Sequence, residues 1–360
     1  MVSCRKEISS LPPYVLGEGF SAEMKKLGVT RVVKLNSNES AWQPFPPAIE
    51  AMQKAVRDLN RYPEARCVEL KSRLSEKYGV PVEGIVVGHG ANVLIRLLCM
   101  TYLAPGDEVV IPWPTFPPYR ISAALMGAAI RLIPLRDWVH DIPAMLDAVN
   151  EKTKMVFICN PNNPTGTILS KEEIEEYFRR VPEHVMTVLD EAYIEFVDKA
   201  DAPPSIDYLR AGKPVTIFRS FSKVYALAGA RVGYALTSRE TAEVMHRAQE
   251  GFPVNHVAQA GAVASLGCDD MVAERVRATI EGCRQLENGF DELGLKHTRS
   301  SANFVWVDVE RDSSEVMRKL MSYGVLVRPG KTYDSPSHIR VTVGTAEENE
   351  ICLEALRKVL

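Results

Sequence analysis

The stretch Ile217-Phe218-Arg219-Ser220-Phe221-Ser222-Lys223, with Ala230-Arg231-Val232-Gly233 close behind it, decides the fold that we expect. Its apolar residues predict a short strand, and a lysine stands just beyond the end of that strand. Such a lysine could form an imine with an aldehyde cofactor whose phosphate Ser220 and Ser222 would bind. Arg231 could add a charge-assisted contact to the same phosphate. Because Ser-x-Ser-Lys is common by chance, its meaning depends on partners elsewhere in the chain.

The segments around this stretch repeat one alternation, a short apolar run followed by an amphipathic segment. The alternation is typical of a mostly parallel sheet wrapped by crossover helices. The expected strands are 85–87, 108–112, 129–135, 154–159, 185–189, 215–218 and 233–236. Helices are expected over 91–102 and 171–180, and the second opens with a capping box formed by Ser170 and Glu173. We therefore predict an α/β fold.

The pattern changes near residue 250. Two helical stretches, 255–266 and 270–293, lead into strands expected at 303–308, 325–328 and 339–343, and a last helix is capped by Thr345 with Glu348. We interpret this part as a smaller α/β domain, which the N-terminal arm joins. The expected division is an arm at 1–36, a large domain at 37–249 that binds the cofactor, and a small C-terminal domain at 250–360.

Two further strand ends carry side chains that suit the same cofactor. Asp190 ends an apolar strand, and a pyridine cofactor needs such a carboxylate to keep its ring nitrogen protonated. Tyr193, three residues on, could hydrogen-bond the phenolic oxygen of the cofactor, as could Asn163 in the turn after strand 154–159. Each residue alone has an ordinary structural explanation. The occurrence of all of them at strand ends favours a common site.

The segment Gly88-His89-Gly90-Ala91-Asn92-Val93 follows a strand and opens a helix, as a dinucleotide-binding fingerprint does. Val93, however, stands where a small residue is needed for close packing of helix on strand, so we do not expect a nicotinamide site. The free N–H groups at the start of this helix still suit a phosphate, and a plain strand-to-helix turn is the alternative.

Composition limits the classes of partner. The chain has 43 Lys and Arg against 46 Asp and Glu, a net charge of −3, so we expect a small-molecule partner and no nucleic acid. Its seven cysteines are scattered, with no C-x-x-C spacing, which favours reduced thiols in a cytoplasmic protein over disulfides or a metal site. No signal peptide or membrane span is evident.

Taken together, these motifs resemble the fold-type I pyridoxal-phosphate aminotransferases of class I and II, and most closely the histidinol-phosphate aminotransferase family. The resemblance covers nearly the whole chain. The motifs that carry it are Leu11-Pro12-Pro13-Tyr14, Leu35-Asn36-Ser37-Asn38-Glu39, Asn60-Arg61-Tyr62-Pro63, Asn163-Pro164-Thr165-Gly166, Asp190-Glu191-Ala192-Tyr193, Ser220-Phe221-Ser222-Lys223, Ala230-Arg231-Val232-Gly233 and Ile339-Arg340-Val341-Thr342-Val343-Gly344.

The resemblance implies a role for each matching residue. Lys223 would carry the cofactor pyridoxal 5'-phosphate, Asp190 would pair with its ring nitrogen, and Asn163 and Tyr193 would bind its phenolic oxygen. The phosphate would be held by Ala91, Asn92, Ser220, Ser222 and Arg231, and Phe116 would stack on the ring. Tyr62 would reach into the site of a neighbouring subunit, which implies a homodimer. Arg340 would bind the substrate carboxylate, and Tyr14, Asn38 and Arg328 would meet the rest of the substrate.

The expected activity is therefore transamination, with histidinol phosphate as donor and 2-oxoglutarate as acceptor. The proline that usually follows the Asn-Glu pair of the family is missing after Glu39, and Trp42 stands nearby. An aromatic amino acid aminotransferase for phenylalanine or tyrosine is accordingly the alternative, followed by a threonine-phosphate decarboxylase. A regulator with a DNA-binding domain is not expected, because residues 1–36 are too few for such a domain.

Overall fold

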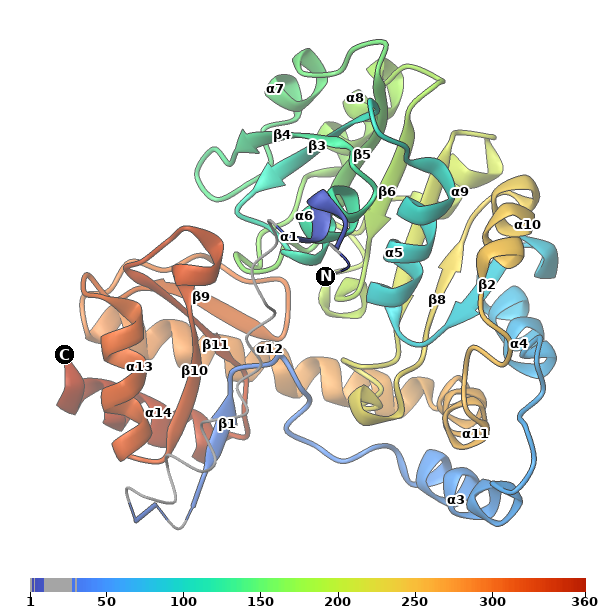
Figure 1. Cartoon of the computed structure of the whole chain (residues 1–360). Helices are drawn as coiled ribbons and strands as arrows, with labels where there is room; N and C mark the ends of the chain where they lie inside the picture. The colour runs from blue at the N-terminus through green and yellow to red at the C-terminus, as the bar shows by residue number, and fades with distance from the viewer. Residues whose placement is uncertain (1, 3, 10–27, 30) are drawn as a thin grey trace.

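The apolar runs around residues 85–236 form one seven-stranded sheet in the computed structural model, which describes residues 2, 4–9, 28, 29 and 31–360 (Figure 1). In sheet order the strands are β2 (Ile85–Gly88), β8 (Gly233–Leu236), β7 (Val215–Ser220), β6 (Met186–Asp190), β5 (Thr153–Cys159), β3 (Glu108–Trp113) and β4 (Ala129–Pro134). Neighbours from β7 to β4 are parallel, whereas β8 is antiparallel to both β2 and β7. The predicted, mostly parallel sheet is confirmed.

Helices cover both faces of this sheet, and its central strands are therefore apolar on both sides. In β5, for example, Val156 and Ile158 pack in one core while Met155 and Phe157 pack in the other. The helices are α3 (Pro46–Ala55), α4 (Val68–Tyr78), α5 (Ala91–Tyr102), α6 (Pro118–Leu125), α7 (Ile142–Asp147), α8 (Lys171–Arg180), α9 (Ser205–Arg210), α10 (Arg239–Ala248) and α11 (His256–Ser265), with 3-10 turns η2 (Val56–Asp58), η3 (Val82–Gly84), η4 (Ile194–Phe196) and η5 (Ala228–Ala230). The capping box predicted at Ser170 is present.

A second, four-stranded sheet has the order β1 (Val33–Leu35), β10 (Val325–Pro329), β11 (His338–Thr342) and β9 (Phe304–Asp308). It packs with α12 (Asp269–Glu292), α13 (Ser313–Ser322) and α14 (Ala346–Val359), and η6 (Gly330–Tyr333) follows β10. β1 pairs in parallel with β10, so the chain before residue 36 adds an edge strand to this sheet. The capping box predicted at Thr345 is present. A short helix, α1 (Lys6–Ser9), lies far from β1, beside α6 (Figure 1).

The two cores meet along α11 and α12. Ala258 and Ala262 of α11 pack in the core of the larger sheet, whereas Leu286 and Phe290 of α12 pack in the core of the smaller sheet. The division at residues 37 and 250 stays a prediction. As a proposal, the packing of α11 against α3 favours a boundary nearer the start of α12.

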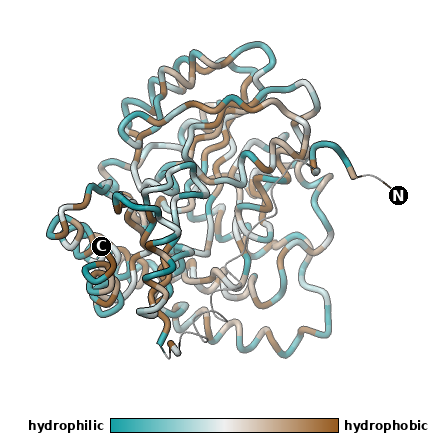
Figure 2. Tube along the Cα trace, turned by 60° about the vertical axis from the view of Figure 1, so that its left-hand side comes forward, coloured by the Kyte–Doolittle hydropathy of each residue, from teal (hydrophilic) through white to brown (hydrophobic). Residues whose placement is uncertain are grey.

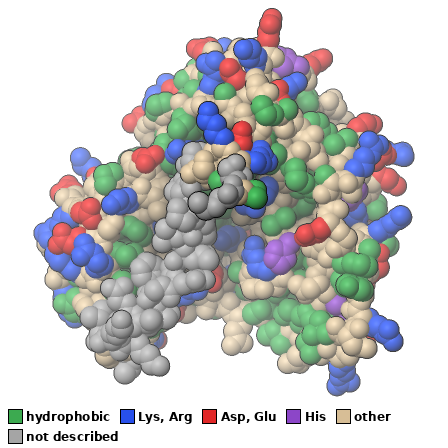
Figure 3. Space-filling view, viewed as in Figure 1, with side chains coloured by type: hydrophobic (Ala, Val, Ile, Leu, Met, Phe, Trp, Pro, Cys, Tyr) green, Lys and Arg blue, Asp and Glu red, His purple; other side chains and the backbone are tan. Residues whose placement is uncertain are grey.

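Hydropathy and charge follow this architecture. Apolar residues concentrate along the inner strands in Figure 2, and hydrophilic residues lie along the outer turns of the helices. On the face shown in Figure 3, basic and acidic side chains are interspersed, which fits the small net charge. Within the described ranges, no helix combines the length and the apolar character that crossing a membrane requires.

Candidate active site

Most of the predicted site residues meet at the carboxyl ends of β5, β6 and β7. In open α/β sheets, ligands bind in crevices at this edge. A cavity of about 340 Å³ lies here, against the start of α5. Ten of the predicted residues line it: Ala91, Asn92, Phe116, Asn163, Asp190, Tyr193, Ser220, Ser222, Lys223 and Arg231.

Lys223 lies three residues past the end of β7. Its Nζ donates a hydrogen bond of 3.0 Å to the backbone carbonyl of Asn38, and it lies 5.4 Å from the centre of the Tyr193 ring. Burial lowers the pKa of Lys223 to about 7, and the positive charges of Arg340 and Arg231 act in the same direction. A substantial fraction of this amine is therefore neutral near neutral pH, as a nucleophile or a base must be.

Asp190 is the last residue of β6, and its side chain is buried. One carboxylate oxygen accepts a 2.6 Å hydrogen bond from the hydroxyl of Tyr119, and the other accepts a 3.0 Å bond from the backbone N–H of Ala192. Burial raises the pKa of Asp190, and the hydrogen bond from Tyr119 opposes this shift. Sequence reasoning missed Tyr119, because no motif marks it and it lies in a helix 71 residues away from Asp190.

The end of the cavity next to α5 suits a phosphate group. Gly90 precedes the helix with φ +81°, and a Cβ on it would lie 2.7 Å from Nη2 of Arg231. Only glycine therefore lets the helix N-terminus and this guanidinium come so close. The hydroxyl oxygen of Ser220 accepts a bond of 3.0 Å from the N–H of Ser222, which fixes the loop between β7 and Lys223.

Tyr193 follows the end of β6, Asn163 follows the end of β5, and both side chains line the cavity. The Tyr193 hydroxyl accepts a 2.9 Å hydrogen bond from Nδ2 of Asn38, and Asn163 Oδ1 accepts one from Nη1 of Arg340. Burial raises the pKa of the Tyr193 hydroxyl, which keeps it protonated and able to donate. Both side chains thus have partners from segments that sequence reasoning did not connect to them.

Asn38 joins several of these groups. Its backbone has φ +53°, and its N–H donates to Oγ1 of Thr342 while its Oδ1 accepts from the same hydroxyl. The carbonyl that accepts from Lys223 also accepts from Nδ2 of Asn303. Thr342 and Asn303 belong to the smaller sheet and the turn before it, so Asn38 connects that part of the molecule to Lys223.

Arg340 and Arg328 face each other in register across β11 and β10. Nη2 of Arg340 and Nε of Arg328 both donate to the carbonyl of Asn36, at 3.0 and 3.2 Å. Nη1 of Arg340 also donates to the Tyr333 hydroxyl at 2.8 Å. Nε of Arg340 is buried without a hydrogen-bond partner among the described residues, so this donor can serve a bound anion.

Four of the predicted residues that the structure describes do not line the cavity: Asn38 and Arg340, which hydrogen-bond to residues that do, and Tyr62 and Arg328. Tyr62 is 81% exposed and stacks on Phe252 with ring centres 4.4 Å apart, so it does not line the cavity of its own chain. Arg328 does not line the cavity either and contacts the site through Asn36. Tyr14 falls outside the described residues.

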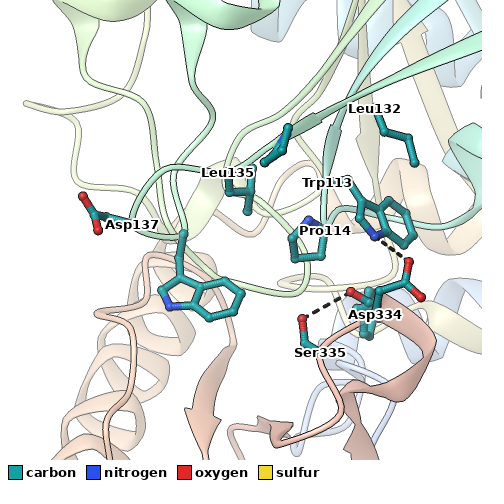
Figure 4. A pocket seen from close by; sticks show the side chains of 10 residues that line it. Trp113, Pro114, Leu132, Leu135, Asp137, Asp334 and Ser335 are labelled. Atoms are coloured by element: carbon teal, nitrogen blue, oxygen red, sulfur yellow. Dashed lines mark hydrogen bonds between the residues drawn. The ribbon is translucent and has the colours of Figure 1, made fainter.

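A larger cavity, of about 500 Å³, opens between β3 and η6 (Figure 4). Trp113 Nε1 donates a 2.8 Å hydrogen bond to Asp334 across it. Among the residues that line it there is neither a lysine nor any of the predicted catalytic groups. The predicted catalytic groups line the smaller cavity beside Lys223 instead.

Comparison with known proteins identifies the family. The chain matches the family Aminotransferase class I and II over residues 30–356. A histidinol-phosphate aminotransferase of Moorella thermoacetica is 42% identical over 358 residues, which cover 99% of this chain and 93% of that protein. Histidinol-phosphate aminotransferase 2 of Carboxydothermus hydrogenoformans is 40% identical over 357 residues, 99% of each chain.

Solved structures agree. A crystal structure of histidinol-phosphate aminotransferase from Sinorhizobium meliloti, in complex with pyridoxal-5'-phosphate, superposes with a TM-score of 0.92 at 28% identity and covers 100% of this chain and 98% of that chain. A Thermus thermophilus aspartate aminotransferase double mutant superposes with a TM-score of 0.87 at 25% identity, over 100% of both chains. The predicted fold type I is thereby confirmed. The chain belongs to the class I and II aminotransferase family, and its predicted resemblance to histidinol-phosphate aminotransferases is confirmed.

Proposed function

We propose that this aminotransferase uses pyridoxal 5'-phosphate to move the amino group of histidinol phosphate to a 2-oxo acid, with 2-oxoglutarate as the preferred acceptor. The observation that carries the proposal is that a half-buried lysine and a buried carboxylate line one cavity. A lysine whose pKa is about 7 and a buried carboxylate line the same space of about 340 Å³, which ends at a helix N-terminus and an arginine. Histidinol phosphate is proposed as the amino donor because the relatives named above are histidinol-phosphate aminotransferases.

The residues present fit the cofactor. The cradle at Gly90, which a Cβ would fill, admits a phosphate between the start of α5 and Arg231, and the hydroxyls of Ser220 and Ser222 line the same end. Phe116 offers a ring face for stacking. When bound, pyridoxal phosphate supplies a ring that takes up negative charge from the carbon next to the substrate nitrogen.

Each side chain then has a distinct task. The Lys223 amine, neutral in a substantial fraction of molecules, would move the proton from the substrate carbon to the cofactor, since its side chain lines the cavity that both would occupy. Asp190 holds the ring nitrogen protonated. Arg340 binds the carboxylate of the 2-oxo acid through its buried Nε, and Arg328 and Asn38 border the remainder of the substrate.

A homodimer is part of the same proposal. Tyr62 would complete the site of a second copy, and its 81% exposure supports this because the face of the ring that does not stack on Phe252 can meet another surface. Val56, Leu59 and Val68, close to it in the sequence, are also exposed. The cytoplasmic location stays a prediction.

The test is a titration of the protein loaded with pyridoxal phosphate, followed by its visible spectrum, with no oxo acid present. Histidinol phosphate at low concentration is expected to convert the bound cofactor to its amino form. Conversion by phenylalanine alone would instead make the protein an aromatic aminotransferase. Release of carbon dioxide from threonine phosphate would make it a decarboxylase, and no spectral change with any donor would contradict the proposal.

A further inference from the structure

The hydroxyl of Tyr119 is a buried group that the proposed mechanism does not yet use. Tyr119 belongs to α6 and has no exposed surface, and its hydroxyl lies 2.6 Å from Oδ2 of Asp190. Its ring stacks on Phe157 of β5 with centres 5.0 Å apart and meets the edge of Phe116 at 5.5 Å. Packing on two sides thus fixes the direction in which the hydroxyl points.

In the hydrogen bond between Tyr119 and Asp190, the phenol is the donor and the carboxylate is the acceptor. Burial and the neighbouring Asp190 charge raise the pKa of Tyr119 well above its ordinary value, so the phenol keeps its proton and donates it to the carboxylate. The other oxygen of Asp190 accepts from the N–H of Ala192. A carboxylate has about four acceptor positions, so two protein donors leave capacity for a third partner in the cavity.

Without such donors, burial would favour the neutral acid. The charges that bear on Asp190 are those of Glu191, which favours the neutral form, and Lys223, which favours the ionised form. Tyr119 is the side chain that donates directly to the carboxylate among the described residues. A carboxylic acid that kept its own proton could not hold a second proton on a pyridine nitrogen.

We propose that Tyr119 is a positioning residue, which keeps the Asp190 carboxylate ionised and oriented towards the cofactor ring nitrogen. The inference rests on the proposed function, since it concerns the ring-nitrogen contact of the same site. It also assigns a task to a residue that no motif in the sequence marks. Removing the hydroxyl lets the proton that lies between the ring nitrogen and Asp190 move towards Asp190, and weakens that contact selectively.

The experiment compares the affinity of the apoprotein for two probes, pyridoxal phosphate and its analogue with a carbon in place of the ring nitrogen. Both keep the phosphate and the aldehyde, so the ratio of their dissociation constants isolates the ring-nitrogen contact. In Tyr119→Phe, the preference for pyridoxal phosphate over the analogue is expected to fall on the order of 3- to 10-fold, which lies within the range of coupling between residues of one hydrogen-bond network. In Tyr177→Phe the preference is expected to be unchanged.

Tyr177 is a matched control, because its hydroxyl is equally buried and bonds at 3.0 Å to Thr187 of the same strand, β6. A preference that is unchanged in Tyr119→Phe, or that falls equally in both variants, would overturn the inference. If Tyr119→Phe does not fold, site-specific 3,5-difluorotyrosine at position 119 keeps the ring and makes a stronger donor. The preference should then rise above that of the wild type, and no rise would overturn the inference.

Failure of the wider proposal gives a different result. Wild-type protein that binds neither probe would overturn the proposed function itself. Wild-type protein that prefers pyridoxal phosphate, together with an unaltered preference in Tyr119→Phe, would overturn only the role of Tyr119.

Discussion

The Nζ of Lys223 lies 3.0 Å from the backbone carbonyl of Asn38, a residue 185 positions earlier in the chain. Asn38 is held in turn by Thr342 and Asn303, so the acceptor of the lysine is fixed by the part of the molecule built on the smaller sheet. The position of the amine therefore depends on contacts between the two sheets. Several measurable consequences follow from this arrangement and from the burial of Lys223.

The first concerns pH. Burial lowers the pKa of Lys223 from 10.5 to about 7, so the unfolded chain binds more protons than the folded chain between these values. The cost of holding a charged lysine in the fold is complete below about pH 7 and disappears as the pH rises towards 10.5. Replacing Lys223 by Met should therefore stabilise the apoprotein more at about pH 6 than at about pH 9 in urea unfolding.

Lys54 gives the control, because its side chain is 75% exposed and pairs only with Glu50 in the described part of the chain. Lys54→Met should change stability by a similar small amount at both pH values. If Lys223→Met showed no such dependence on pH, the lowered pKa of Lys223 would be wrong.

Asn38 should be sensitive to the loss of its side chain. Asn38→Ala removes the bond to Tyr193 and the bond from Thr342, and leaves an alanine at φ +53°, where asparagine is tolerated better. We expect a loss of about 2–4 kcal/mol in the free energy of unfolding. Thr342→Val removes the contacts from the other side and should shift stability in the same direction, so opposite shifts would contradict the network.

Gly90 should not accept a side chain. In Gly90→Ala the new Cβ would meet Nη2 of Arg231 at 2.7 Å and would also carry the strain of φ +81°. The affinity for pyridoxal phosphate is expected to fall about tenfold or more, since one hydrogen bond to a charged group is worth that much. Gly212→Ala separates the two effects, because Gly212 has φ +75° with open space around it. Equal losses of affinity in both variants would contradict the proposal that the phosphate binds beside Gly90.

Arg340 is expected to bind the carboxylate of the 2-oxo acid. Arg340→Lys keeps the charge but loses the planar donors, including the buried Nε. The KM for 2-oxoglutarate is expected to rise about 10- to 100-fold, whereas Arg318→Lys, on the exposed side of α13, should leave it unchanged. An unaltered KM in Arg340→Lys would remove Arg340 from the substrate site.

Local chemistry made much of the fold predictable. The helix at 91–102 and the capping boxes at Ser170 and Thr345 are where their residues indicate, because turn and cap residues act over three or four positions. The observed ends of each strand in the larger sheet lie within two residues of the predicted ends. The antiparallel direction of β8 was not predicted, since a short buried strand reads the same in either direction.

The contacts within the site were harder to foresee. Asn163 was assigned to the cofactor, yet its oxygen accepts from Arg340, 177 residues away. The buried pair of Glu191 and Arg219, at 2.7 Å, and the bond from Tyr119 to Asp190 are likewise set by the tertiary fold. Nothing in the local sequence encodes such pairs, because side chains at distant positions meet only after the strands have been ordered in the sheet.

The assignment of Lys223 is tested most directly by finding which lysine carries the cofactor. The protein is loaded with pyridoxal phosphate, its bond to the lysine is reduced with borohydride, and the labelled peptide is located by mass spectrometry. The label is expected on Lys223 alone, and Lys223→Ala should yield no labelled peptide while still binding the cofactor through the phosphate contacts. A label on another lysine, or an unlabelled wild-type protein, would contradict the role of Lys223.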